Sequence, residues 1–275
     1  MYAPRDLVEY AVRVLMDLIR FPTVNPPGEK YGECVDYLAD KLAETGMEVR
    51  VVEIPEGYLD KHYPYRPLHR SRPRYIVLGR AGRGEVLHFN GHYDVVPPGD
   101  GWTLSPFEPL IKCGRIYGRG STDMKGGIAS LLAALKWALE EGLKPGIAVE
   151  VALVPDEEAG GLGTRFLVES GLVKARHVVV CEPTTPNRIV VGHKGLVRGV
   201  VRVFGRQAHG SSPWRGENAF LKAAMLALEF LKDYEPLLKK RKTRWPVEAL
   251  NEAYPTVNLG GYAESLSKKD NVVPG

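Results

Sequence analysis

The sequence has few of the features that identify disulfide-bonded, zinc-finger or membrane proteins. Its 275 residues include three cysteines, Cys34, Cys113 and Cys181, which are far apart and form no Cys-x-x-Cys pair. This pattern argues against both a disulfide framework and a zinc-finger module. No apolar run approaches the roughly 18 residues of a membrane-spanning helix. The first residues carry acids at Asp6 and Glu9 and no apolar core, unlike a secretory signal, so we expect a cytoplasmic protein with no membrane partner.

A strong charge of either sign is also missing. Lys and Arg number 37 and Asp and Glu number 33, which gives a formal net charge of +4. Nucleic-acid-binding domains usually concentrate Lys and Arg on one face. The only basic run is KKRKTR at 239–244, and no aromatic-lined sheet or known module accompanies it. We therefore predict no nucleic-acid partner. The 44% apolar and 25% charged residues are typical of a globular protein.

The first 193 residues alternate between helical and strand patterns. Helical spacing of apolar residues covers 5–20, 31–45 and 127–141, and the strand candidates are 48–54, 75–78, 86–90, 147–154 and 178–181. This alternation favours an α/β fold, a three-layer α/β/α domain with a mostly parallel sheet, over residues 1–193. The Pro- and Arg-rich loop 55–74 is expected to be the least structured segment, with its basic residues on a solvated surface.

The pattern changes after residue 193. Apolar and basic residues alternate over 196–204, as in a strand with one wet face. A long helix is predicted over 217–234, and two short strands are predicted near 256–259 and 272–273. We predict a second, smaller α+β domain over residues 194–275.

Four motifs with acids or histidine follow predicted strands or begin a predicted helix. They are His92-Tyr93-Asp94, Asp123 in GRGSTDMKGG, Glu157-Glu158, and Glu182 in CEPT. Because the carboxyl ends of parallel strands open into the ligand-binding crevice of such a sheet, all four are predicted to meet at one rim. Each motif alone has an ordinary structural explanation, so the hypothesis rests on their joint occurrence.

These residue types suit a pair of metal ions. Two ions about 3.5–4 Å apart can activate a shared water and polarise a carbonyl. Imidazole and carboxylate suit Zn²⁺, and Co²⁺ or Mn²⁺ could replace it. His92 and Asp94 are two residues apart and point the same way if the strand continues. His92 could then bind a metal while Asp94 accepts the other ring N–H. Glu157 and Glu158 point to different sides, so one can bind a metal while the other faces water.

The motifs together resemble one enzyme family. They are HYDVVP, GRGSTDMKGG, PDEEAGG, CEPT and GRQAHGSSPWRGENA, in that order. The sequence is similar to the co-catalytic zinc amidohydrolase and peptidase family, which includes succinyl-diaminopimelate desuccinylase, acetylornithine deacetylase, aminoacylase and glutamate carboxypeptidase. The resemblance runs from the first predicted helix to NVVPG at 271–275, and it implies two zinc ions. It also implies that His92 binds one zinc, Asp123 bridges both, Glu158 binds the second, and Glu182 completes the first site.

The resemblance further implies the roles of four other residues. Glu157 is then the general base, Asp94 orients His92, and His209 and Asn271 contact the substrate. Residues 1–193 form the catalytic metal-binding domain, and residues 194–275 form a domain that covers the site and mediates homodimerisation.

The implied reaction is hydrolysis of an amide in a small N-acylated amino acid, of the desuccinylase or deacetylase type found in amino-acid biosynthesis. A dipeptidase or carboxypeptidase of the same family is the alternative. Members of the family continue beyond NVVPG, complete both domains there and supply a last His ligand. We therefore expect this chain to be truncated, and a catalytically inactive fragment is a further alternative.

Overall fold

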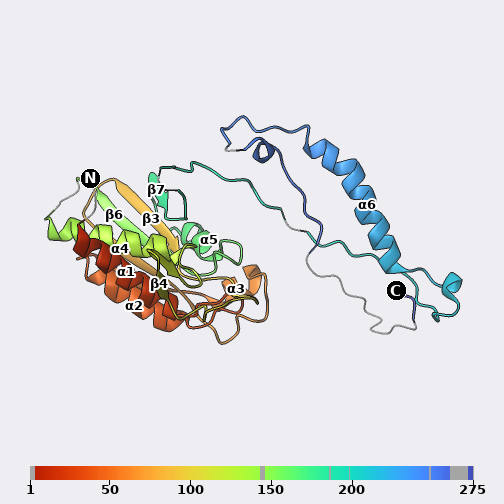
Figure 1. The fold of residues 1–275 in the computed structure, drawn as a ribbon, viewed down its shortest axis with the longest axis horizontal. Helices are drawn as coiled ribbons and strands as arrows, with labels where there is room; N and C mark the ends of the chain where they lie inside the picture. Colours follow the sequence, from red (N-terminus) through yellow and green to blue (C-terminus); the bar gives the residue numbers. More distant parts are fainter. Residues whose placement is uncertain are drawn as a thin grey trace. The chain divides into compact units, whose positions relative to one another are not determined.

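The computed structural model describes residues 4–142, 146–185, 187–197, 199–247, 249–260 and 272–274. The chain divides into two compact units, Met1–Arg188 and Ile189–Gly275 (Figure 1). The elements of the first unit are α1 (Arg5–Arg20), α2 (Tyr31–Ala43), β1 (Glu48–Ile54), α3 (Glu56–His62), β2 (Arg74–Ala81), β3 (Val86–His92), β4 (Leu110–Lys112), β5 (Arg115–Tyr117), α4 (Lys125–Glu140), β6 (Ala148–Val154), α5 (Leu162–Glu169) and β7 (His177–Val180). None of the described helices combines the length and the apolar character needed to cross a membrane.

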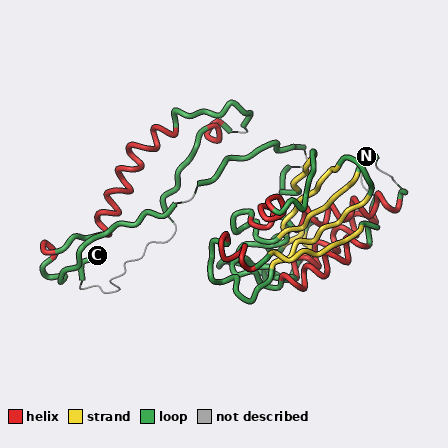
Figure 2. The backbone as a smooth tube through the Cα atoms, turned by 180° about the vertical axis from the view of Figure 1, so that it is seen from behind, coloured by secondary structure: helices red, strands yellow, loops and turns green. Residues whose placement is uncertain are grey.

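Five strands form the main sheet of the first unit, in the order β1-β2-β6-β3-β7. Strands are drawn in yellow in Figure 2. β3 runs parallel to β6 and β7, whereas β2 runs antiparallel to β1 and β6. The α/β class is confirmed, but the sheet is mixed rather than mostly parallel. As a result, the carboxyl ends of β3, β6 and β7 share one edge of the sheet with the amino end of β2.

Helices cover both faces of this sheet, because its central strands bury apolar side chains on both sides. Val77 of β2 and Val151 of β6 pack with residues of α1, α2 and α4. Their neighbours Ile76 and Ala152 point the other way and pack with residues of α3 and α5. Successive side chains of a strand alternate between faces, so these two clusters define the predicted three layers.

The helices of the first unit follow from their apolar spacing. In α1, Val14, Leu15, Leu18 and Ile19 are buried and recur at helical spacing. α2 ends shortly before Gly46, whose φ of +73° lies in the left-handed region that favours glycine after a helix. Both helices were predicted, whereas α3, α5 and the β4–β5 hairpin were not.

The second unit differs from its prediction. In the part that the structure describes, it contains one α-helix, α6 (Ala219–Leu238), and two 3-10 turns, Pro213–Arg215 and Leu250–Ala253. The predicted strand over 196–204 is wrong, because its described residues are irregular and Val197 is 95% exposed. Residues 256–259 are irregular as well, and Val272 forms only an isolated bridge with His209. A strand needs a hydrogen-bonded neighbour, and alternation of residue types cannot supply one.

Candidate metal centre

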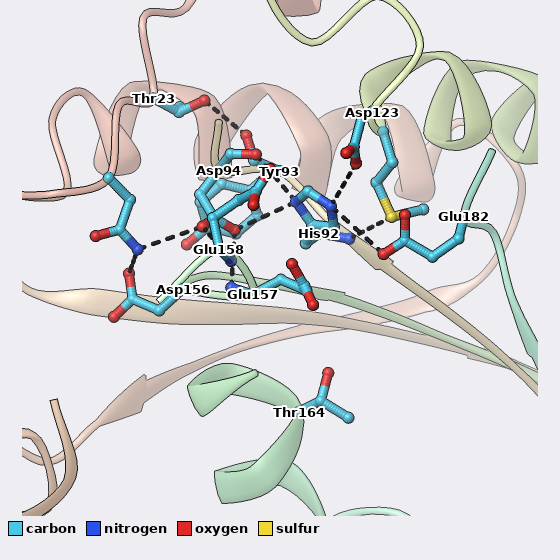
Figure 3. Close-up of polar contacts among 12 residues, drawn as sticks. Thr23, His92, Tyr93, Asp94, Asp123, Asp156, Glu157, Glu158, Thr164 and Glu182 are labelled. Carbon is cyan, nitrogen blue, oxygen red and sulfur yellow. Dashed lines mark hydrogen bonds and ion pairs between the residues drawn. The ribbon is translucent and has the colours of Figure 1, made fainter. Parts of the chain in front are cut away.

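The predicted site residues of the first unit gather at the sheet edge where β3, β6 and β7 end. His92 is the last residue of β3 and is 1% exposed. Glu157 and Glu158 follow β6, and Glu182 follows β7. Asp123 comes from the loop that leads into α4. Figure 3 shows the imidazole of His92 among these carboxylates.

The two ring nitrogens of His92 face different groups (Figure 3). Nε2 lies 3.1 Å from Oδ1 of Asp123 and 3.5 Å from Oε1 of Glu182. Nδ1 lies 3.0 Å from the carbonyl oxygen of Asp94 and 3.4 Å from its carboxylate Oδ1. A histidine held by an oxygen at one ring nitrogen presents the other nitrogen in a fixed orientation. Nε2 is therefore the atom positioned to meet a metal ion.

Two sets of side chains have the donor atoms and the spacing to hold metal ions. The ligand atoms of His92, Asp123 and Glu182 lie within 4.8 Å of one another, and so do those of His92, Glu157 and Glu158. Imidazole nitrogen and carboxylate oxygen are ordinary zinc ligands. The donor set therefore fits divalent zinc. Within the described part of the chain, His92 is the only histidine in either set.

The electrostatics of the cluster favour a cation. Burial and the charge of Asp123 raise the pKa of Glu158 to about 7. Burial disfavours a charged His92, but hydrogen bonds to Asp123 and Asp94 outweigh it and raise the pKa of the imidazole to about 11. The carboxylates around His92 contribute to both shifts, and a divalent cation would offset their negative charge.

Asp94 supports the turn that carries the two glutamates. Its buried carboxylate accepts hydrogen bonds from the backbone N–H groups of Glu157 at 3.1 Å and of Glu158 at 3.2 Å. The same carboxylate accepts from Nδ2 of Asn25 at 3.3 Å. Asp94 thus links the β3 end, with His92, to the turn after β6.

A glycine in the first turn of α4 lets the residue after β7 come close. A Cβ on Gly127 would collide with the carbonyl oxygen of Cys181, the residue before Glu182. This close approach explains why the sequence has glycine at that position in GRGSTDMKGG. It also brings the start of α4 next to the end of β7.

Several buried polar residues beside this centre were not predicted from the sequence. Asn25, Arg74 and Asp156 are each at most 2% exposed and are hydrogen-bonded to one another or to Asp94. The expectation that the basic residues of loop 55–74 are solvated is therefore wrong for Arg74. The sequence feature that could have indicated this cluster is a third acid, Asp156, immediately before the predicted glutamate pair.

The remaining two predicted site residues belong to the second unit. His209 lies in an exposed turn, where its Nδ1 is 2.8 Å from the hydroxyl of Ser211. Asn271 lies outside the described residues. The substrate-binding roles of both stay predictions.

Proteins of known family are similar to this chain. The profile of Peptidase family M20/M25/M40 matches residues 88–269. An uncharacterized metallohydrolase of Methanocaldococcus jannaschii is 33% identical over 273 residues, which cover 88% of this chain and 65% of that protein. A succinyl-diaminopimelate desuccinylase of Methylobacterium radiotolerans is 34% identical, over 97% of this chain and 66% of that protein. The chain thus spans just under two thirds of the length of these relatives.

A solved structure shares the fold. The M20 family metallo-carboxypeptidase of Sulfolobus solfataricus aligns with a TM-score of 0.65 at 21% identity, over 96% of this chain and 68% of that chain. The profile match over more than half of the sequence shows that the chain belongs to peptidase family M20/M25/M40.

Proposed function

We propose that the protein is a metal-dependent hydrolase that cleaves the amide bond of a small N-acylated amino acid. The proposal is carried by one observation: Nε2 of buried His92 lies 3.1 Å from a carboxylate oxygen of Asp123, in a cluster that also holds Glu182 and two adjacent glutamates. The name of the Methylobacterium radiotolerans relative, a succinyl-diaminopimelate desuccinylase, supports this substrate class.

In this proposal two Zn²⁺ ions, or Co²⁺ or Mn²⁺, are held by His92, Asp123, Glu158 and Glu182. The imidazole and carboxylate donors of these residues support the assignment. When bound, such ions supply Lewis-acid polarisation of the substrate carbonyl and lower the pKa of the attacking water.

Glu157 is the proposed general base and acid. The family resemblance assigns Glu158 as a ligand and Glu157 as the carboxylate that exchanges protons, and both lie beside His92. It accepts the proton of the attacking water while the new C–O bond forms at the carbonyl carbon. It then returns that proton to the amide nitrogen as the C–N bond breaks, which releases the amine. Asp94 supports this role because it fixes the backbone of Glu157.

A substrate screen of the zinc-loaded chain tests the proposal. N-succinyl- and N-acetyl-amino acids are expected to be hydrolysed faster than dipeptides. Glu157→Gln is expected to lower kcat by about 10²–10⁴-fold, the usual size of a general acid–base contribution, without changing the zinc content. Cleavage of dipeptides alone would favour the dipeptidase or carboxypeptidase alternative. Zinc binding with no turnover of any substrate would favour the inactive alternative.

We also propose that His209 and Asn271 contact the substrate and that two copies pair through the second unit. α6 supports pairing, because it leaves Phe220, Met225 and Leu228 between 65% and 69% exposed. Light scattering is expected to give the mass of a dimer, and a monomer mass at every concentration would contradict the pairing.

A further inference from the structure

A buried polar cluster adjoins Asp94. Each residue of the cluster is at most 3% exposed. The members are Asn25, Tyr31, Tyr63, Arg74 and Asp156. β2 is antiparallel to β6, so the first residue of β2, Arg74, lies at the edge where β6 ends and Asp156 follows. The sheet topology therefore brings the cluster to the metal centre.

The fold fully specifies the position of the Arg74 guanidinium. Its Nε donates to Oδ2 of Asp156 at 3.0 Å, and its Nη2 donates to the carbonyl oxygen of Pro27 at 2.6 Å. The group also lies over two tyrosine rings, 5.2 Å from the centroid of Tyr31 and 4.9 Å from that of Tyr63. A planar cation with several fixed partners holds a carboxylate more rigidly than a flexible ammonium group does.

A glycine makes room for this guanidinium. Gly28 has a φ of +96°, and a Cβ at this position would collide with the terminal atoms of Arg74. Both the backbone angle and the close contact require glycine here. The loop that contains Gly28 is thus shaped around the arginine.

Asp156, the partner of Arg74, has an unusual backbone conformation. Its φ is +57°, in the left-handed region that a residue other than glycine rarely adopts. Such a conformation persists where the surrounding contacts fix it. Asp156 has three contacts of this kind: Arg74, the hydroxyl of Tyr31 at 2.8 Å, and Nδ2 of Asn25 at 2.9 Å. The next two residues are Glu157 and Glu158, whose N–H groups point at Asp94.

Asn25 joins this turn to Asp94. Its Nδ2 donates to Asp156 and, at 3.3 Å, to Oδ2 of Asp94, so one amide group spans two buried carboxylates. Two buried negative charges this close need a compensating cation, and leaving such a charge unpaired is strongly unfavourable. Arg74 supplies a positive charge directly bonded to one of them.

We propose that Arg74 is a positioning residue of the metal centre. By binding Asp156, Arg74 fixes the left-handed residue that precedes Glu157 and Glu158 and so orients both glutamates. Asp156 in turn binds Asn25, which holds the carboxylate of Asp94 in place beside His92. This inference rests on the proposed function, since it takes His92 and the glutamates to be the residues that serve the metal. Arg74 itself touches neither metal nor substrate in this account.

Substitution of Arg74 tests the proposal with two readouts. Competition with a chromophoric chelator gives the dissociation constant for Zn²⁺. Amide hydrogen exchange in the metal-free chain gives the local stability of the Glu157 and Glu158 N–H groups, with Val149 at the far end of β6 as the reference. For Arg74→Gln we expect about 10–100-fold weaker Zn²⁺ binding, as for other groups that orient metal ligands. Exchange at Glu157 and Glu158 should accelerate at least tenfold more than at Val149. Arg74→Lys keeps the positive charge. Its Zn²⁺ affinity and its exchange rates at Glu157 and Glu158 should therefore lie between those of Arg74→Gln and wild type.

Two glycine substitutions provide a second test if the arginine variants do not fold. Gly28 and Gly84 share a φ of +96°, but nothing lies within 4 Å of a Cβ on Gly84. Both Gly28→Ala and Gly84→Ala therefore strain the backbone alike, while only Gly28→Ala displaces Arg74. We expect weaker Zn²⁺ binding and faster exchange at Glu157 and Glu158 for Gly28→Ala alone.

Two results would overturn the inference. One is Zn²⁺ affinity within threefold of wild type in Arg74→Gln and Gly28→Ala. The other is exchange that accelerates equally at Val149 and at the two glutamates, because Arg74 would then stabilise the sheet as a whole. If the unsubstituted chain binds no Zn²⁺, the proposed function fails, and the exchange measurements alone decide whether Arg74 positions the turn.

Discussion

Replacing Asp94 with asparagine should weaken both the fold and the metal centre. The carboxylate of Asp94 accepts hydrogen bonds from the N–H groups of Glu157 and Glu158 and from Nδ2 of Asn25, at 3.1, 3.2 and 3.3 Å. Asparagine has nearly the same shape but replaces one acceptor oxygen with a donor. At least one of the three donors then loses its acceptor in a site that is fully buried.

The expected size of each effect follows from these contacts. A hydrogen bond to a charged group contributes about 1.5–3 kcal/mol, so Asp94→Asn should lower the free energy of unfolding by at least about that amount. Misorientation of His92 should weaken Zn²⁺ binding about 10–100-fold. That loss corresponds to about 1.4–2.8 kcal/mol of binding free energy, since each tenfold change is about 1.4 kcal/mol.

Two assays separate these effects. Urea unfolding in the presence of a chelator measures stability without metal, and chelator competition measures the dissociation constant for Zn²⁺. Asp36→Asn is the matched control, because Asp36 is exposed on α2 and surface changes usually stay within about 0.5 kcal/mol. An Asp94→Asn variant that unfolds at the wild-type urea concentration and binds Zn²⁺ within threefold of wild type would refute the reasoning.

Three further predictions concern the scaffold around the site. Leu132→Ala, in the fully buried core between α4 and the sheet, should cost about 2–5 kcal/mol in urea unfolding, and a loss under 1 kcal/mol would contradict the packing described. Lys125 is buried and its Nζ donates to the carbonyl oxygens of Leu18 at 2.9 Å and Phe21 at 2.7 Å, so Lys125→Met should cost about 1–3 kcal/mol by removing both hydrogen bonds; unchanged stability would contradict this role. Burial lowers the pKa of His88 below its usual 6.5 despite the hydrogen bond to Glu150. The folded state thus favours the neutral ring, so its contribution to stability is complete above pH 6.5 and is lost as the pH falls below that value. Unfolding free energies at pH 7.5 and 5.5 should differ less in His88→Gln than in wild type, and an equal difference in both proteins would rule out this role.

The parts of the site that the sequence revealed are those fixed by chain order along the sheet. His92 ends a strand of strong apolar character, Glu157 and Glu182 each follow a strand, and parallel neighbours end at the same edge. Their meeting point depends only on which strands pair in parallel, and β3, β6 and β7 do so. Asp123 was recognised from its motif at the start of a helix.

The supporting cluster escaped prediction because its contacts are distant in sequence. Arg74 and Asp156 are 82 residues apart, and Arg74 lies in a segment whose composition suggested a solvated loop. Composition records that Arg74 sits among prolines and other arginines, but it does not record that β2 begins there and runs antiparallel to β6. That pairing buries Arg74 and provides its counterion.

In the second unit, by contrast, a predicted strand does not form. Alternating residue types over 196–204 predicted a strand, yet the described residues of this span have no strand partner and leave Val197 and Val200 at least 84% exposed. Periodicity reports which side chains share a face. Whether a strand forms also depends on a neighbouring strand, which the pattern does not contain.

The central claim is that side chains from four separate segments form one metal centre at the sheet edge. An anomalous difference map from zinc-soaked crystals of this chain tests it most directly. The account predicts a peak beside Nε2 of His92, within ligand distance of carboxylate oxygens of Asp123 and Glu182. A map with no peak there, or with zinc bound only at other side chains, would contradict the account.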